Sequence, residues 1–512
     1  MKVDLRRLNI LILLCILSLA VMPTESVYAD TMDNQEIEST DTEQDLEGFD
    51  EDEESGFSDD SESDDLISIQ DETDGVADRF LSFGGFFKED IGYSYEHEES
   101  QPDFSKIKSS LNLSLDLRFS DDWRMKGIWN GSYDYAYSHF GRDEFTEATL
   151  DAYESESEIR DLYLDGSLSR WLQLQFGRQI IAWGESELEQ IVDLANPRDN
   201  RELGMVDVED ARIPVFATKL TLLFDALEVN LVAIHEIRPN KAPGAGSEFD
   251  PLAGLRNVFD INKEELPDGG SDDTEYLIRI YKSFNGGDVG LFWADVYHDS
   301  YHLDFEGFNA GTSKLSVTPR HKRIQSIGLS GNLVRGPWLF RTEMALKAGV
   351  AIARNQENLT AQITETVMAS MVSGTTYYSR ETQVISTWSE KDLLQGMLGF
   401  DYSGFQNITI SVEGNLETIR DHEENLGSME NSGSVIFHLR HSAMNDTLIT
   451  DFFWFHLTED NGDLYRVNLD YDFNDALTLS GGVVVYEASK EDAQVYPFQK
   501  NDRLFSAVKY SF

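Results

Sequence analysis

The chain has 512 residues and a formal net charge of −53. A charge this negative argues against nucleic acid as a partner, because the phosphates would be repelled. The single cysteine, Cys15, lies in a segment that we expect to be removed on export, so the mature chain has no thiol for disulfides, iron–sulfur clusters or thiolate zinc sites. We expect no cofactor and no metal site.

The first 29 residues read as a signal peptide. A basic start (Lys2, Arg6, Arg7) precedes an apolar run over 8–21, and small residues precede a cleavage point at Asp30. The run is too short for a comfortable transmembrane helix of about 20 residues. No later stretch approaches that length, so an exported chain of this size is periplasmic, secreted or a membrane barrel.

Residues 30–79 form an acidic segment with 22 acidic residues and one basic residue, a net charge of −21. Self-repulsion and scarce apolar residues predict disorder. The favoured interpretation is a solvated periplasmic tether. The alternatives are a docking tail for a basic periplasmic protein and a weak calcium-binding tail. The signal peptide carries +1, so residues 80–512 keep a charge of −33.

From residue 80 onward, apolar and polar residues alternate over stretches of about ten residues. In Leu111–Phe119 every odd position is apolar and every even position is polar, as in a strand with one face on lipid and the other on water. Similar stretches predict eighteen strands, near 82–96, 107–119, 123–137, 158–168, 171–182, 213–223, 226–236, 276–284, 288–298, 322–333, 338–350, 393–403, 407–418, 433–442, 447–457, 463–473, 476–487 and 502–512.

The connections between these strands alternate in length. Short turns join every second pair of strands, as at 120–122, 285–287 and 335–337. The connections between these hairpins, such as 183–212 and 351–392, are mostly long. Bacterial barrels have short periplasmic turns and long external loops. We therefore predict an all-β fold: a transmembrane, antiparallel, up-and-down barrel of about eighteen strands over 80–512. An even number of strands leaves both termini in the periplasm.

The last strand ends on a C-terminal aromatic residue. Leu504, Val508, Tyr510 and Phe512 lie on one face. This pattern resembles the assembly signal of Gram-negative outer-membrane barrels. It predicts a location in the bacterial outer membrane, with membrane lipid and the barrel assembly machinery as partners.

Residues 158–220 carry the most distinctive motifs. They are Gly177-Arg178-Gln179, Trp183-Gly184-Glu185, Asn196-Pro197-Arg198-Asp199 and Arg212-Ile213-Pro214. This GRQ…WGE…NP.D…RIP order resembles a domain-of-unknown-function family of proteobacterial outer-membrane proteins. The resemblance implies genetic association with RND-type exporters of the MMPL class, and hence traffic in lipids or other hydrophobic molecules.

Strict alternation would place Arg178 on the lipid face, where an arginine at the midplane costs about 2–4 kcal/mol. Gly177 could host a bulge that re-aims the next side chain. We therefore expect Arg178 to point into the lumen and to pair with Glu185 or Asp161.

The 183–212 connection is predicted to fold into the barrel. Leu188, Ile191, Val192 and Ala195 recur at helical spacing, and Asn196-Pro197 would end the helix. One interpretation is a buried network of Arg178, Glu185, Asp199 and Arg212 that clamps the loop to the wall. The other is a constriction that selects the passenger. The candidate lumen residues are Asp161, Arg178, Gln179, Trp183, Glu185, Asn196, Asp199 and Arg212. In the 351–392 connection, Ile363, Val367, Met368 and Met371 also recur at helical spacing. This pattern fits a second inward loop or an external cap, and it fits an ordinary surface helix equally well.

Three functions fit these patterns. The first is an outer-membrane channel or export conduit for hydrophobic or lipid-like cargo, working with an inner-membrane RND-type transporter. The second is a general or substrate-specific diffusion porin. The third is a surface hydrolase of barrel type, although the sequence shows no G-x-S-x-G, P-loop or H-E-x-x-H motif in a matching context. We therefore expect no enzymatic activity.

Overall fold

The computed structural model describes residues 80–97, 102–205, 208–225, 227–309, 311–312, 314–355, 386–459, 462–490 and 493–512. The predicted signal peptide, the acidic segment and the helical pattern at 363–371 lie outside these residues.

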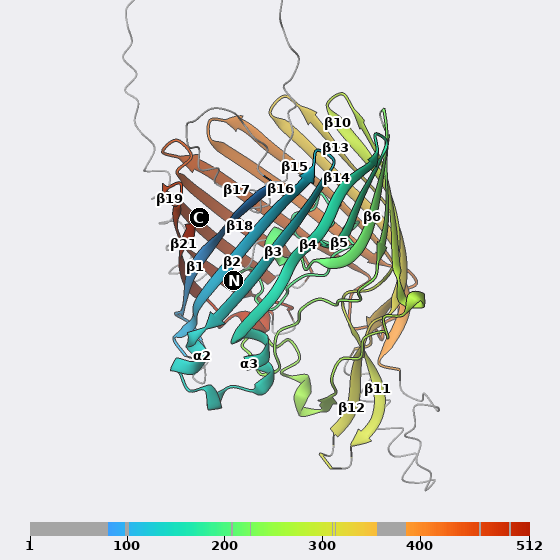
Figure 1. The fold of residues 1–512 in the computed structure, drawn as a ribbon. Coiled ribbons are helices and arrows are strands. Elements are labelled where there is room, and N and C mark those ends of the chain that lie inside the picture. The colour runs from blue at the N-terminus through green and yellow to red at the C-terminus, as the bar shows by residue number, and fades with distance from the viewer. Residues whose placement is uncertain are drawn as a thin grey trace, which may run out of the picture.

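Eighteen long strands form one sheet (Figure 1). They are β1 (Leu81–Ser94), β2 (Phe104–Ser120), β3 (Trp123–Asp134), β4 (Ser155–Ser169), β5 (Leu172–Gln179), β6 (Val215–Phe224), β7 (Leu227–Ile234), β9 (Glu275–Phe284), β10 (Gly287–Tyr297), β13 (Arg323–Arg335), β14 (Trp338–Ala353), β15 (Trp388–Phe405), β16 (Ile408–Ile419), β17 (Asn431–Ala443), β18 (Leu448–Leu457), β19 (Gly462–Asn474), β20 (Leu477–Ala488) and β21 (Arg503–Ser511).

Each of these strands pairs antiparallel with its neighbours along the chain, and β1 pairs with β21 from Phe86↔Ser511 to Ser94↔Arg503. The sheet therefore closes into a barrel and leaves no free edge, which is the condition for crossing a bilayer with strands. The predicted eighteen-stranded antiparallel barrel is confirmed. β1 begins and β21 finishes at the end that carries the short turns. That this end faces the periplasm stays a prediction.

Short helices and a small sheet lie at the end of the long connections (Figure 1). The helices are α2 (Tyr135–His139), η2 (Arg142–Glu144), α3 (Glu147–Tyr153), α4 (Val208–Ala211), η3 (Leu255–Asn257), η4 (Ser271–Asp273) and η6 (Tyr496–Phe498). In the small sheet, β12 (Lys314–Arg320) pairs antiparallel with β11 (His302–Asn309) and parallel with β8 (Phe259–Ile261). No helix in the described ranges is long and apolar enough to cross a membrane.

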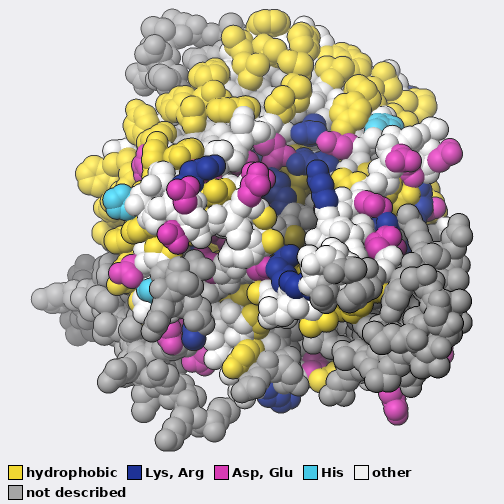
Figure 2. Space-filling model, turned by 90° about the horizontal axis from the view of Figure 1, so that it is seen from below, with side chains coloured by type: hydrophobic (Ala, Val, Ile, Leu, Met, Phe, Trp, Pro, Cys, Tyr) yellow, Lys and Arg dark blue, Asp and Glu magenta, His cyan; other side chains and the backbone are white. Residues whose placement is uncertain are grey.

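The outer wall of the barrel is apolar. Hydrophobic side chains gather along much of its margin when the barrel is viewed from the long-loop end (Figure 2). Leu398 on β15 is 72% exposed and Phe83 on β1 is 61% exposed, which would be unfavourable in water and is the expected surface in lipid. The four residues of the C-terminal pattern share this outer face: Leu504, Val508, Tyr510 and Phe512 are all exposed. Their role as an assembly signal stays a prediction.

Candidate functional site

The connection between β5 and β6, residues 180–214, folds into the barrel, as the sequence predicts. Trp183 is buried and its ring centroid lies 6.0 Å from that of Phe292 on β10. Ile191, Val192 and Ala195 are buried in the same apolar cluster, which reaches the inner faces of β6, β7, β9, β10, β13, β14, β15 and β16. We call these inner faces, together with the loop that covers them, the packed half of the lumen.

The loop is anchored by carboxylates of the barrel wall. Glu343 on β14 accepts hydrogen bonds from the backbone N–H groups of Glu185, Ser186 (3.2 Å) and Val192 (3.3 Å). Glu413 on β16 accepts from the Ser186 hydroxyl (2.6 Å) and from the Glu187 N–H (3.0 Å). Both carboxylates are 1% exposed. Buried N–H groups need acceptors, and here strands more than 150 positions away supply them.

This anchoring corrects the predicted helix. Residues 185–196 adopt no helix, although Ile191, Val192 and Ala195 are buried as their spacing predicts. In a helix the N–H groups would bind carbonyls four residues earlier. Glu343 and Glu413 take that place, so the chain can follow the inner wall in an irregular path.

Basic residues of β14 satisfy the loop carbonyls. Arg341 donates to the Glu185 carbonyl, and Lys347 Nζ donates to the Gln190 carbonyl at 2.6 Å. Arg341 also lies 3.2 Å from the Glu187 carboxylate and 3.0 Å from Asp401. The packed half therefore binds both the donors and the acceptors of the loop backbone.

Within the loop, Asp193 and Asn196 hold the two stems together. Asp193 accepts from the Trp183 N–H (3.3 Å) and from Arg212 Nε (3.0 Å). Asn196, which is fully buried, accepts from the Ile181 N–H and donates to the Ile213 carbonyl, both at 2.7 Å. Trp183, Asn196 and Arg212 therefore stabilise the conformation of the loop itself.

The predicted network of four charged residues does not form. Each member binds a residue that the sequence did not single out. Arg212 pairs with Asp193, Asp199 pairs with Arg201, Arg178 pairs with Glu236, and the backbone of Glu185 binds Glu343 and Arg341. The clamp exists, but its ionic partners come from the wall and from elsewhere in the loops.

Arg178 does not point into the lumen. Its cross-strand neighbours are Leu162 and Phe216, two exposed apolar residues of the outer face. The register runs through Gly177 without a shift, so no bulge re-aims the side chain. Gly177 has φ +132°, and a Cβ there would lie 2.2 Å from the Leu162 carbonyl oxygen. Arg178 pairs with Glu236 at 2.5 Å, near the long-loop rim, where a charge is better tolerated than at the midplane.

Two further candidates belong to the inner wall. Gln179 is buried at the end of β5 and donates to the Ala217 carbonyl at 3.2 Å. Asp161 on β4 faces inward opposite Ile128 and is 8% exposed. Neither contacts Arg178 through a described hydrogen bond or ion pair, so Asp161 is not its partner.

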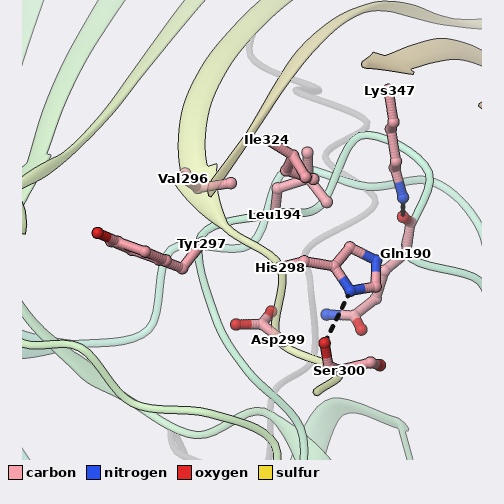
Figure 3. A pocket seen from close by; sticks show the side chains of 9 residues that line it. All are labelled: Gln190, Leu194, Val296, Tyr297, His298, Asp299, Ser300, Ile324 and Lys347. Carbon is pink, nitrogen blue, oxygen red and sulfur yellow. Dashed lines mark hydrogen bonds between the residues drawn. The ribbon is translucent and has the colours of Figure 1, made fainter. Parts of the chain in front are cut away.

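A small cavity of about 40 Å³ separates the loop from β10, β13 and β14 (Figure 3). Burial lowers the pKa of His298 to about 4, and burial together with the nearby Glu275 raises the pKa of Asp299 well above its usual range. His298 Nδ1 lies 3.1 Å from the Ser300 carbonyl oxygen. The space suits one or two waters and is too small for a passage.

The inner faces of β1–β5 and β18–β21 differ from the packed half, and we call them the polar half. Toward the short-turn end their inward positions are largely polar, as in the Asn112–Asn130 hydrogen bond of 2.6 Å between β2 and β3. Near the long-loop end, Leu464, Val484 and Tyr486 are instead buried in a second apolar cluster. At the short-turn end, residues of β2–β5 line a cavity of about 820 Å³ bordered by Arg118, Arg124 and Asp165. Arg124 pairs with Asp165 at 2.9 Å.

The loop tip crosses to the polar half near the long-loop end. Glu202 pairs with Lys106 on β2, and the Leu203 carbonyl accepts from the Tyr486 hydroxyl on β20. Burial opposes ionisation of Glu202, but the Lys106 ammonium and the Arg503 guanidinium hold its pKa down at about 2. Arg201 binds Glu156 on β4 at 2.9 Å. These contacts hold the loop tip across the long-loop end of the barrel and narrow the opening of the lumen there.

Sequence reasoning missed the residues that matter most for the loop: Glu343, Glu413, Arg341 and Glu202. Each wall residue is a polar position in an alternating strand and looks like any other lumen-facing residue. No group of three or more His, Cys, Asp or Glu side chains in the described ranges could hold a metal ion.

The family model described as "Protein of unknown function (DUF1302)" matches residues 100–512. This match confirms the predicted relation to an uncharacterised family. No curated protein matches the chain. Similar solved structures include Acinetobacter baumannii OccAB2, with 9% identity and a TM-score of 0.47 over 84% of this chain and 98% of that chain. Pseudomonas aeruginosa OccK8 (OprE) gives 7% identity and a TM-score of 0.46 over 84% and 98%. Similarities this low do not inform the function.

Proposed function

Because the chain belongs to the DUF1302 family, whose activity is unknown, we propose a function from the structure: an outer-membrane channel whose passage follows the polar half of the lumen. One observation carries this proposal. A closed barrel with an apolar outer wall has an interior divided into a packed side and a polar side. A loop that only filled the barrel would be expected to cover the whole inner wall, whereas this loop leaves polar side chains of one side uncovered.

We extend this proposal to the kind of molecule that passes through the channel and to the protein that supplies it. Aromatic rings such as Phe86 and Phe505 face the lumen among the polar residues, and they favour a passenger with an apolar part. The relation to exporters that the sequence implies adds an inner-membrane RND-type transporter as the source of that passenger. On this proposal the protein is an export conduit, and the acidic segment is its periplasmic handle.

The test is the conductance of the purified full-length protein in planar bilayers. We expect discrete current steps that grow when the loop anchor at Glu343 is removed. A barrel that inserts correctly and stays electrically silent, with and without Glu343, would reject the passage. Deletion of residues 30–79 separates conduit from simple porin: export in cells should fail while the bilayer conductance stays unchanged.

A further inference from the structure

The inner face of three adjacent strands, β21, β1 and β2, concentrates basic side chains. The strand register places six basic and two acidic residues on this face. The basic residues are Arg503, Lys106, Lys108, Lys88, Lys509 and Arg118, and the acidic residues are Asp90 and Asp116. Residues 80–512 together carry −33, so this excess of cations is local. Lysine and arginine side chains lie around the central hollow together with aspartate and glutamate side chains (Figure 2).

These cations follow one another along the barrel wall. The registered pairs Ser94↔Arg503, Gly92↔Lys106, Asp90↔Lys108 and Lys88↔Lys509 occupy successive inward positions. Successive inward positions on a strand are about 7 Å apart. Arg118 stands apart from this row: it borders the cavity of about 820 Å³ at the short-turn end, beyond the inward pairs Phe86↔Asn112, Gly84↔Ser114 and Ser82↔Asp116. The row of Arg503, Lys106, Lys108, Lys88 and Lys509 thus runs from the long-loop end toward the middle of the wall, and we call it the basic strip.

Carboxylates from the loops occupy the outer end of the basic strip. Glu202 pairs with Lys106, and Glu248 pairs with Arg503 at 2.8 Å. Neither carboxylate belongs to the wall. They show which chemical group the strip binds. Lys108, the next cation along the strip toward the short-turn end, makes no ion pair with any residue that the structure describes.

Two aromatic rings that face the lumen lie beside cations, one of them Lys509 of the basic strip and the other Arg466 on β19, outside the strip. Phe505 lies over Gly482 on β20, where an added Cβ would approach the ring to 2.4 Å. Arg466 Cζ lies 5.7 Å from the centre of that ring, and Lys509 Nζ lies 5.2 Å from the centre of the Phe86 ring. Each pair of a ring and a cation offers an apolar face and a positive charge at the same place.

We propose that the basic strip is a binding track for anionic amphiphiles. The anionic head is bound by the cations, the apolar body lies on Phe505 and Phe86, and Glu202 and Glu248 hold the outer positions until the passenger displaces them. This inference rests on the proposed channel and names the class of its passenger.

The experiment compares three probes on the full-length protein in planar bilayers: decanoate, decyltrimethylammonium and acetate. We expect decanoate to block the current at a concentration about tenfold lower than either other probe, because a charge-assisted contact is worth about that factor. Equal block by the two ten-carbon probes would overturn the role of the cations. Equal block by decanoate and acetate would overturn the role of the rings.

Two variants locate the effect. Lys88→Gln combined with Lys509→Gln should weaken decanoate block about tenfold. Lys126→Gln removes an inward lysine from β3, outside the strip, and should leave the block unchanged. If both variants behave alike, the strip is not the site.

Native mass spectrometry of the same proteins keeps the two proposals separable. Decanoate should be retained by the native chain and lost from the double variant, even if no current is seen. A silent barrel that retains decanoate would reject the passage and keep the strip. A conducting barrel that retains none would reject the strip alone.

Discussion

The two halves of the lumen are built from the same kind of strand and have opposite interiors. In the packed half, inward positions such as Ala217, Ile234 and Leu277 are almost fully buried under the loop. In the polar half, the corresponding positions of β2 and β3 carry Lys108, Ser110 and Lys126. The packed half supplies the rigidity that a loop within a barrel needs, and the polar half remains available for a passenger.

The largest effect should come from the centre of the packed half. Trp183→Ala removes a buried indole that packs on Phe292, and such a truncation costs about 3–5 kcal/mol. The urea midpoint of the folded barrel, followed by circular dichroism, should fall accordingly. Trp171→Ala is the control, because Trp171 is 49% exposed at a short turn and its loss should leave the midpoint nearly unchanged. Equal shifts would mean that the loop is not part of the core.

The next effect should come from the wall anchor. Glu343→Ala leaves the N–H groups of Glu185, Ser186 and Val192 without their acceptor, at about 3–4 kcal/mol in total once water has partly replaced it. The loop should leave the wall, and single-channel conductance should rise. Glu343→Gln keeps one carbonyl acceptor and should show an intermediate conductance. Native conductance in the alanine variant would show that the loop does not depend on this anchor.

The contrast between these anchors and the strands shows what the sequence could predict. Alternation depends on the local exposure of each face, so all eighteen strands could be located. The loop conformation depends on Glu343 and Glu413, which lie more than 150 positions further along. The apolar spacing of Ile191, Val192 and Ala195 correctly marked a buried surface. It could not show whether carbonyls of a helix or carboxylates of the wall would bind the backbone.

The contact between the loop tip and the polar half should respond to pH. The pKa of Glu202 is depressed to about 2. Its ionised carboxylate therefore stabilises the folded contact by about 3 kcal/mol at any pH above the ordinary glutamate pKa near 4.5. This stabilisation is lost as the pH falls toward 2. Conductance should therefore be constant from pH 7 to 5 and rise below pH 4. Lys106→Met removes the stabilising ammonium, so the rise should occur at a higher pH. Lys126→Met is the matched control, and an identical pH profile in both variants would contradict the contact.

The smallest effect should come from Arg178, the residue that the sequence made most conspicuous. Alternation alone assigns Arg178 to the outer face, and the structure agrees with alternation. The prediction failed because it assumed a midplane position, whereas β5 ends one residue later, beside Glu236. A partly exposed pair of this kind is worth less than about 1 kcal/mol. Arg178→Ala should therefore leave both the urea midpoint and the conductance close to native values. A double-mutant cycle with Glu236→Ala measures the pair directly, and a coupling well above 1 kcal/mol, or an altered conductance, would return Arg178 to the functional site.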